Sequence, residues 1–138
     1  MTSFAPLLIV LVLSSAFGIW YQRTRGAIKS AVNKAPEPLL SEAEIGGSYG
    51  SRVTLVQFSS AFCTPCRVTK MILSQIASES TDISYVEIDA ESHLELVRRL
   101  HIHSTPTTLI LDRNGVEIAR AAGAPKKSDV LASLASIH

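Results

Sequence analysis

Cys63 and Cys66 are the residues of this chain whose type and spacing most directly indicate chemistry. The reactive form of cysteine is the thiolate, and a free thiol is mostly protonated near neutral pH. The pair follows an apolar run, Val53–Phe58, that is typical of a buried strand, and precedes a helical pattern over Arg67–Ser78. A helix N-terminus stabilises a thiolate through unpaired N–H groups and a partial positive charge. Because the chain has no other cysteine, any intramolecular disulfide must join these two.

Bulk composition limits the classes of function without selecting one. The chain has 138 residues, enough for one domain and an appendage, and its formal net charge is +1. A charge this close to zero gives no indication of a nucleic-acid partner, and none is expected. Hydrophobic residues make up 46% of the chain but are unevenly spread, with a long apolar run near the N-terminus.

That uncharged apolar run covers residues 4–21, FAPLLIVLVLSSAFGIWY. As a helix with a rise of ~1.5 Å per residue it would cover roughly 27 Å, close to the ~30 Å hydrocarbon core of a bilayer. Trp20 and Tyr21 end the run, and aromatic rings favour the membrane interface. Because no basic residue precedes the run and no clear cleavage site is present, an uncleaved transmembrane helix is favoured over a signal peptide. We therefore expect a single-pass membrane protein that contacts lipid through this helix.

Residues 22–38 are typical of a basic, proline-containing linker. Four basic residues come before the first acid of the chain: Arg23, Arg25, Lys29 and Lys34. Positive charge beside a membrane segment tends to stay in the cytoplasm, so the domain after the linker is expected there, with an extracytoplasmic position as the alternative. Ala27–Val32 is expected to continue the helix briefly, before Pro36 and Pro38 end it. The predicted domain occupies residues 39–138.

The hydrophobic pattern of residues 39–138 predicts alternating strands and helices. A short helix is expected over Leu39–Ile45 with Ser41 as its cap, and Ser92 with Glu95 matches the capping box of another helix. The remaining expected elements are a strand over Ile83–Asp89, a helix running through Leu100, a strand over Thr107–Leu111, a hairpin turn at Asn114-Gly115, a strand over Val116–Arg120 and a helix over Lys126–Ile137. A βαβ unit followed by a hairpin gives an α/β fold, with a mixed sheet of four or five strands and helices on both faces.

From about Val53 to the C-terminus, the residues resemble the thioredoxin superfamily. The features that carry the resemblance, in the family's order, are the strand Leu55–Phe58, the motif Cys63-Thr64-Pro65-Cys66, the segment Thr105-Pro106-Thr107 and the pair Gly123-Ala124. A lone Cys-X-X-Cys is a weak signal because zinc sites use it too. The same motif with a Thr-Pro roughly forty residues later, in this strand order, is a strong one. The resemblance implies a thioredoxin-like fold.

The resemblance also implies a role for each of these residues. Cys63 would be the nucleophile that attacks a substrate disulfide, and Cys66 would resolve the mixed disulfide. Cys63 is expected to be the more exposed of the two. Thr105 and Pro106, joined by a cis peptide bond, would face the cysteines and bind the substrate main chain, with Phe62 beside them. The chain would then be a thiol–disulfide oxidoreductase acting on proteins, with a separate protein as electron donor or acceptor and no cofactor.

Three positions depart from the family pattern. Phe62 stands where thioredoxins usually have Trp, Thr64 stands where they usually have Gly, and Gln57 stands where they carry a buried Asp. That carboxylate assists proton transfer with the resolving cysteine, whereas an amide cannot accept a proton near neutral pH. A narrower range of partners is therefore expected. Glu87 is a candidate substitute base if its side chain lies on the inner side of its strand near Gln57, and an exposed edge position is the alternative.

Two other classes of function stay open. One is a thioredoxin-fold binding or assembly module with little redox turnover. The other is a zinc-stabilised domain, in which Cys63 and Cys66 would ligate together with His101 and His103. Alternate residues on an extended segment point in opposite directions, and no further ligand comes after the cysteines at zinc-finger spacing, so no metal ligand is expected.

Overall fold

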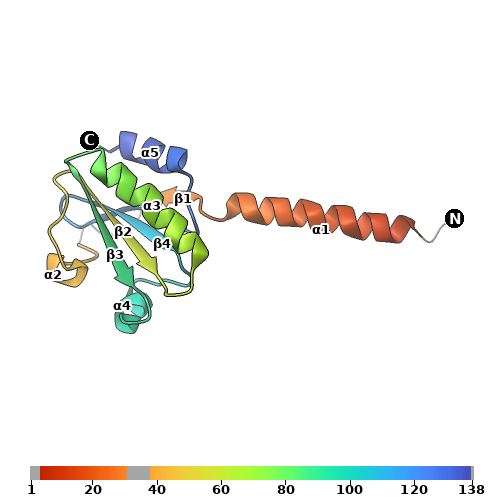
Figure 1. Cartoon of the computed structure of the whole chain (residues 1–138), viewed down its shortest axis with the longest axis horizontal. Coiled ribbons are helices and arrows are strands. Elements are labelled where there is room, and N and C mark those ends of the chain that lie inside the picture. Colours follow the sequence, from red (N-terminus) through yellow and green to blue (C-terminus); the bar gives the residue numbers. More distant parts are fainter. Residues whose placement is uncertain (1–3, 31–37, 138) are drawn as a thin grey trace.

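The structure is a computed structural model, and it describes residues 4–30 and 38–137. A long N-terminal helix projects from one side of an α/β domain (Figure 1). The helices and strands, in chain order, are α1 Ala5–Thr24, β1 Ile28–Ser30, α2 Glu42–Ile45, β2 Val53–Ser59, α3 Thr64–Ser78, β3 Ile83–Asp89, α4 Leu94–Arg99, β4 Thr107–Asp112, β5 Glu117–Ala122 and α5 Lys127–Ala135.

The sheet has five strands in the order β1-β5-β4-β2-β3. β2 is parallel to β3, whereas the other three pairs are antiparallel. The predicted mixed sheet and the β4–β5 hairpin are therefore confirmed. The hairpin turn closes through a hydrogen bond from the Gly115 N–H to the Asp112 carbonyl at 3.0 Å, with Gly115 at φ 79. That left-handed conformation strains residues with a Cβ, which explains the glycine.

Helices cover both faces of the sheet and enclose two hydrophobic cores. α3 and α5 pack on one face, where Leu73 and Leu134 meet side chains of β2 and β4. α2 and α4 cover the other face, to which they contribute Ile45 and Leu96. β2 runs between the two cores, and all seven of its residues are buried. Because both faces of β2 are covered, its C-terminal end has a fixed position, and the loop that holds the cysteines begins there.

A short edge strand lies inside the segment that the sequence predicted as linker. Ile28–Ser30 form β1 and pair antiparallel with β5. The expected continuation of the helix over Ala27–Val32 is therefore wrong where the structure describes it. α1 ends at Thr24, and Gly26 at φ 83 turns the chain toward the sheet. The predicted boundary at residue 39 leaves this strand out of the domain, and residues 31–37 of the linker lie outside the described residues.

Two helix starts show why one predicted cap formed and another did not. Ser41 caps α2, because its Oγ accepts from the Glu44 N–H at 3.3 Å while the Glu44 carboxylate accepts from the Ser41 N–H at 2.8 Å. Ser92 does not cap α4, since its hydroxyl donates to the Asp89 carboxylate at 2.6 Å. α4 begins only at Leu94 and has no side-chain cap. The predicted capping box at Ser92 is therefore wrong.

α1 extends a little further than the predicted run of residues 4–21. None of its residues is buried against the domain. Its length and composition suffice to cross a membrane, and among the described residues it is the one helix that meets that test. At its C-terminal end the Arg25 guanidinium lies 5.2 Å from the centroid of the Tyr21 ring. An aromatic ring and a cation thus mark the level at which such a helix would leave a bilayer.

Removal of residues 1–21 is predicted to leave a folded, soluble domain, because the sheet begins at Ile28 and α1 contributes to neither core. Removal of residues 1–30 also takes away β1 and the contact of Ile28 with the α3–α5 core. That longer deletion is predicted to lower the free energy of unfolding by about 1–3 kcal/mol relative to the shorter one. Urea unfolding followed by circular dichroism measures both. Aggregation of the shorter deletion would show that α1 is part of the fold.

Candidate active site at the start of helix α3

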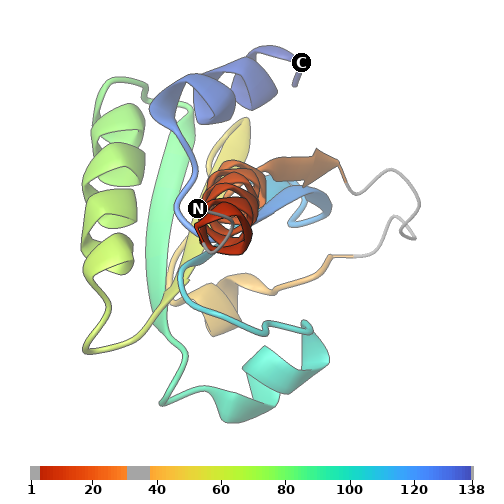
Figure 2. The ribbon, with the colours of Figure 1, turned by 90° about the vertical axis from the view of Figure 1, so that its right-hand side faces the viewer.

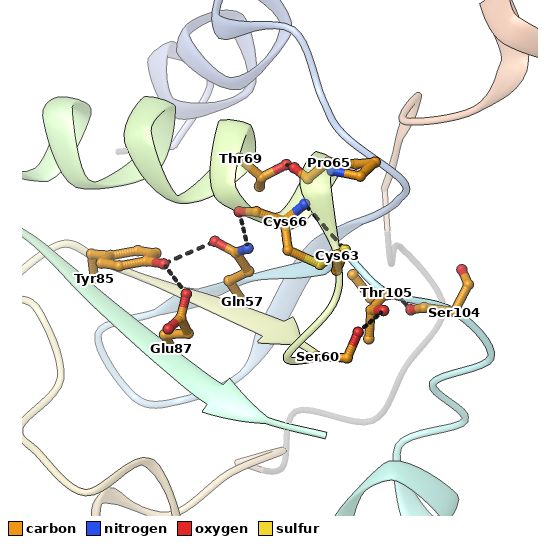
Figure 3. Close-up of a disulfide and its surroundings, with 11 residues drawn as sticks. Gln57, Ser60, Cys63, Pro65, Cys66, Thr69, Tyr85, Glu87, Ser104 and Thr105 are labelled. Atoms are coloured by element: carbon orange, nitrogen blue, oxygen red, sulfur yellow. Dashed lines mark hydrogen bonds between the residues drawn. A yellow bond between two sulfur atoms is a disulfide. The ribbon is translucent and has the colours of Figure 1, made fainter. Parts of the chain in front are cut away.

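Cys63 and Cys66 are joined by a disulfide at the N-terminus of α3 (Figure 3). The helix begins at Thr64, about one turn earlier than the pattern from Arg67 indicated, so Cys63 itself is the N-cap residue. The Cys63 Sγ accepts a hydrogen bond from the Cys66 N–H at 3.2 Å. Pro65 fits the first turn because that position has no intrahelical use for an N–H. A backbone N–H and the helix dipole therefore both act on the first sulfur, as stabilisation of a thiolate requires.

The two cysteines differ in exposure. Cys63 is 9% exposed and Cys66 is 3% exposed, so the predicted order is confirmed although both are largely buried. A hollow of about 300 Å³ opens beside them, and its lining includes both cysteines, Lys70, Glu87 and Asp89. A larger hollow of about 700 Å³ lies between α2 and α4 and is lined by neither cysteine. Solvent thus reaches the disulfide from the side of β3.

Gln57 lies beneath the disulfide and is fully buried. Its Nε2 donates to the Cys66 carbonyl at 2.8 Å, and its Oε1 accepts from the Tyr85 hydroxyl at 2.8 Å (Figure 3). Burial of the phenol, and next the negative charge of Glu87, raise the pKa of Tyr85 above its ordinary value. The hydroxyl therefore stays protonated and able to donate. Both ends of the buried amide are satisfied, so Gln57 holds the first turn of α3 against β2 without a buried charge.

Glu87 lies opposite Gln57 in the β2–β3 register, and paired residues present their side chains on the same face of a sheet. Its carboxylate accepts from the Lys70 Nζ at 3.2 Å and lies 3.5 Å from the Tyr85 hydroxyl. The side chain is exposed on the edge strand, where it lines the same hollow as Cys66. The expected proximity to Gln57 is therefore indirect, through Tyr85, and the exposed edge position that was its alternative is also found.

Asp89 is a second carboxylate beside the hollow. Hydrogen bonds from the Ser92 hydroxyl and, next, from the Glu91 N–H lower the pKa of Asp89 from its ordinary value. A carboxylate held in this way is a poorer proton acceptor, because those bonds favour its ionised form. Glu87 is therefore the better placed of the two carboxylates to accept a proton from the side of the hollow.

The segment before β4 faces the cysteine loop. The Thr105–Pro106 peptide bond is cis, as predicted. The hydroxyls of Ser60 and Thr105 lie 3.0 Å apart and join the two loops (Figure 3). The Pro106 carbonyl accepts from the Gly123 N–H at 2.8 Å, which ties the same segment to the end of β5. Three of the four stretches that carried the family resemblance thus meet at one edge of the sheet.

The other predicted site residues are on the surface. Phe62 is 98% exposed, so its ring has no packing role in the domain and is free to contact a partner. His101 and His103 are both exposed, and His101 has φ 55 at the end of α4. Within residues 4–30 and 38–137, no three His, Cys, Asp or Glu side chains lie close enough together to hold a metal ion.

Sequence reasoning missed three contributors to this site: Ser60, Lys70 and Tyr85. From the sequence, Tyr85 was interpreted only as a bulky strand residue. Its hydrogen bond to Gln57 depends on the register of β2 against β3. A polar tip on an otherwise apolar strand is the signal that was present, since a buried hydroxyl normally finds a partner. Lys70 comes one helical turn after Cys66, which places it on the same side of α3 as the second cysteine.

Comparison with known proteins agrees with this site. The family described as Thioredoxin matches residues 46–136, well over half of the chain. Thioredoxin H2-1 of Oryza sativa is 28% identical over 76 residues, which cover 55% of this chain and 54% of that protein, about half its length. Thioredoxin of Mycobacterium bovis is 32% identical over 88 residues, which cover 63% of this chain and 75% of that protein. Among solved structures, thioredoxin NaTrxh of Nicotiana alata has a TM-score of 0.60 at 22% identity, covering 77% of this chain and 99% of that one.

The family match together with the close cysteine pair at the start of α3 makes the chain a thioredoxin-like disulfide oxidoreductase. More specifically, it belongs to the thioredoxin family, as the family match and the mycobacterial relative show. Thioredoxins act on protein thiols and disulfides, which gives the general kind of partner. The family match begins at residue 46, after α1 and β1.

The Gln57→Asp variant is predicted to resolve a mixed disulfide faster than the matched Gln57→Asn variant. The two side chains have the same shape, but only the carboxylate can take the proton of Cys66. A free thiol already has a few per cent thiolate, so we expect an acceleration of roughly 10- to 100-fold, at or below the low end for general-base catalysis. Single-turnover reduction of a peptide disulfide by each reduced variant measures the rate. Equal rates would show that another group already serves as the base or that proton transfer does not limit the step.

Stability provides an independent readout for the same pair. Both variants should be less stable than the parent, because a shorter side chain leaves the Tyr85 hydroxyl or the Cys66 carbonyl unpaired, at about 1–3 kcal/mol for each group. Burial should raise the pKa of the new carboxyl in the folded state above its unfolded value of about 3.9. The Gln57→Asp variant should therefore be most stable at acid pH and lose stability as the pH rises through the folded pKa. The Gln57→Asn variant should show no such loss.

Proposed function

We propose that this protein is a membrane-tethered thiol–disulfide oxidoreductase that exchanges disulfides with other proteins through a reversible Cys63–Cys66 disulfide. The observation that carries the chemistry is the hydrogen bond from the Cys66 N–H to the Cys63 Sγ at the start of α3. The tether rests on α1, whose apolar side chains are exposed along the whole helix. Arg23 and Arg25 at its end favour a cytoplasmic domain, with an extracytoplasmic one as the alternative.

In the reducing direction the cycle starts from two thiols. The Cys63 thiolate attacks one sulfur of a substrate disulfide; that bond breaks, and the departing substrate thiolate takes up a proton. Cys66 then loses its proton and attacks the Cys63 sulfur, which releases the second substrate thiolate and closes the Cys63–Cys66 disulfide. Two electrons have passed to the substrate, and a separate thiol protein restores the pair. Run in reverse, the same steps oxidise a substrate dithiol.

The resolving step needs a proton acceptor near Cys66. Gln57 cannot serve, since its amide holds the Cys66 carbonyl in place and does not accept a proton near neutral pH. Glu87 reaches the same hollow as Cys66, so water in that hollow can pass the proton to its carboxylate. Lys70, paired with Glu87 at 3.2 Å, holds that carboxylate beside the hollow. Resolution is therefore expected to be slower than with a buried carboxylate at position 57.

Substrate binding is assigned to the loops around the disulfide. The main chain at Thr105 and Pro106 faces the cysteine loop and can pair with an extended substrate segment by backbone hydrogen bonds. Phe62, one residue before the attacking cysteine, supplies an exposed apolar ring beside that segment. Recognition is thus expected to depend on substrate backbone and on an apolar residue near the substrate cysteine.

A second candidate is a binding or assembly module of thioredoxin fold with little redox turnover. The neutral Gln57–Tyr85 pair in place of a buried carboxylate favours it, because this substitution slows the release of a bound partner. The two functions differ in the fate of the mixed disulfide. An oxidoreductase turns over with excess reductant, as insulin reduction would show, whereas a binding module holds its partner.

Trapping of partners in membranes tests the proposal. In a Cys66→Ser variant the mixed disulfide cannot resolve, so adducts that disappear with dithiothreitol should accumulate. The Cys63→Ser variant should give none. Membranes are washed with alkaline carbonate before non-reducing electrophoresis, and the adducts should remain in the pellet because a spanning helix resists that wash.

The reverse trapping pattern would overturn the roles of the two cysteines. Adducts found only in the carbonate supernatant would contradict the tether and leave the thiol chemistry standing.

A further inference from the structure

α1 leaves the domain at the same edge of the sheet that carries the disulfide. Strand register shows this: Phe58 near the end of β2 lies opposite Thr107, which lies opposite Ala122 at the end of β5. Ile28, the first residue of β1, lies opposite Ala121. The end of β2, the start of β4, the end of β5 and the start of β1 therefore lie side by side. They form an edge of the sheet made of strand ends, not of one outer strand. We call it the catalytic edge, because the loops of Cys63 and Pro106 extend from it.

The chain just after α1 is held at that edge by backbone contacts. The Gly26 N–H donates to the Ala122 carbonyl at 2.7 Å. A Cβ on Gly26 would clash with the Ala124 carbonyl oxygen, so the chain passes closer here than any side chain allows. The next residue of that loop, Gly123, donates its N–H to the Pro106 carbonyl at 2.8 Å. Two hydrogen bonds thus connect Gly26, two residues after the end of α1, to the cis-proline loop, so the domain fixes the point from which α1 leaves it.

Two views show the consequence. In Figure 1, α1 extends away from the side of the domain on which α3 begins. Figure 2 looks onto that side, with α1 seen nearly end-on and the domain behind it. Three strand spacings of ~4.8 Å, roughly 15 Å in all, separate the start of β1 from the end of β2, which leads to the cysteines.

We propose that the catalytic edge faces the bilayer and that the substrates are cysteines in extended segments of other membrane proteins, close to the bilayer surface. This rests on the proposed membrane-tethered oxidoreductase. Four residues of helix, about 6 Å, separate the aromatic ring at Tyr21 from Arg25, which leaves room for an extended chain beneath the domain and none for a folded one. A soluble globular protein would have to reach the disulfide through that gap.

Charge and exposed apolar surface at the catalytic edge agree with this placement. Arg25, next to Gly26, and Lys126, two residues after Ala124, are both exposed, and anionic head groups would attract them. Phe62 extends from the same edge with 98% of its surface exposed, which suits an apolar partner segment. The acidic residues Asp89 and Glu91 lie at the corner formed by β3, the strand farthest from β1.

Depth labelling tests the orientation without relying on activity. The full chain is reconstituted in phosphatidylcholine vesicles with a quencher on the lipid head groups. A fluorophore is attached to Cys63 in the Cys66→Ser variant. For comparison, it is attached at Asn114→Cys in a variant with both native cysteines replaced by serine. Asn114 is exposed in the β4–β5 turn, roughly 20 Å away at the opposite edge. Several-fold stronger quenching at Cys63 is expected, and equal or weaker quenching there would overturn the proposal.

The proposed substrate class is tested by varying the distance of a substrate disulfide from the bilayer. A synthetic transmembrane peptide carries a disulfide loop beyond a proline-rich spacer of two or about twenty residues, the longer reaching roughly 60 Å at ~3.1 Å per residue. Both peptides share the vesicle with the reduced full chain, and the same loop without a membrane segment reports the thiol chemistry. The short spacer should be reduced roughly tenfold faster than the long one, because its effective concentration at the edge is higher.

A matched pair of glycine variants tests whether the backbone contact at Gly26 causes the preference for the short spacer. Gly26→Ala should weaken the preference for the short spacer while reduction of the free loop is unchanged. The added Cβ of Gly18→Ala meets nothing within 4 Å. That variant should keep the preference for the short spacer and the rate of reduction of the free loop. Equal rates for the two spacers in the parent would overturn the inference and leave the proposed function intact. Failure to reduce any loop, the free one included, would instead contradict the proposed function, and the depth labels would still decide the orientation.

Discussion

The burial of β2 between two partners is the constraint on which the rest of this structure depends. The strand pairs along its length with β3 on one side and β4 on the other, and both of its faces are covered by helices. A one-residue slip would exchange the side chains of the two cores, so the register is strongly fixed. The end of β2 is therefore fixed as well, and with it the position of Cys63 relative to the cis-proline loop. The edge strand β1 pairs with β5 and so joins α1 to the same sheet.

Local electrostatics at the start of α3 stabilise a thiolate at one of the two cysteines more than at the other. Cys63 is the N-cap of α3 and receives a backbone N–H, whereas Cys66 sits inside the helix above a neutral amide. Gln57 and Tyr85 satisfy each other where the family commonly places a carboxylate, so the site avoids the cost of burying a charge. The same arrangement leaves position 57 without a proton acceptor for Cys66. In the proposed mechanism, the avoided buried charge and the expected slow resolution therefore have the same cause.

Patterns that are local in sequence predicted the parts of this structure that local forces decide. The apolar run before Cys63, the hairpin turn at Gly115 and the cap at Ser41 each depend on neighbouring residues, and all three are found. The cis peptide bond before Pro106 was predicted from the family resemblance, and it is found. β1 escaped prediction because Ile28-Lys29-Ser30 has no distinctive pattern; it forms because Gly26 turns the chain onto the free edge of β5.

Tertiary contacts decided the remaining differences. Ser92 has the sequence of a cap, but the nearby Asp89 carboxylate takes its hydroxyl. Tyr85 joins the site only because β3 pairs with β2 in a particular register. The exit of α1 at the same edge as the cysteine loop likewise depends on pairing between β1 and β5, which lie far apart in the sequence, and no local pattern predicts that pairing.

The proposed chemistry depends above all on Cys63, at the start of α3, being the activated thiol. The most direct measurement is the pH dependence of alkylation of the fully reduced protein by iodoacetamide, with the modified cysteine located by mass spectrometry. We predict that Cys63 reacts first, with a midpoint below the ordinary thiol pKa of about 8.5. Prior modification of Cys66, or a Cys63 midpoint at or above that value, would contradict this assignment.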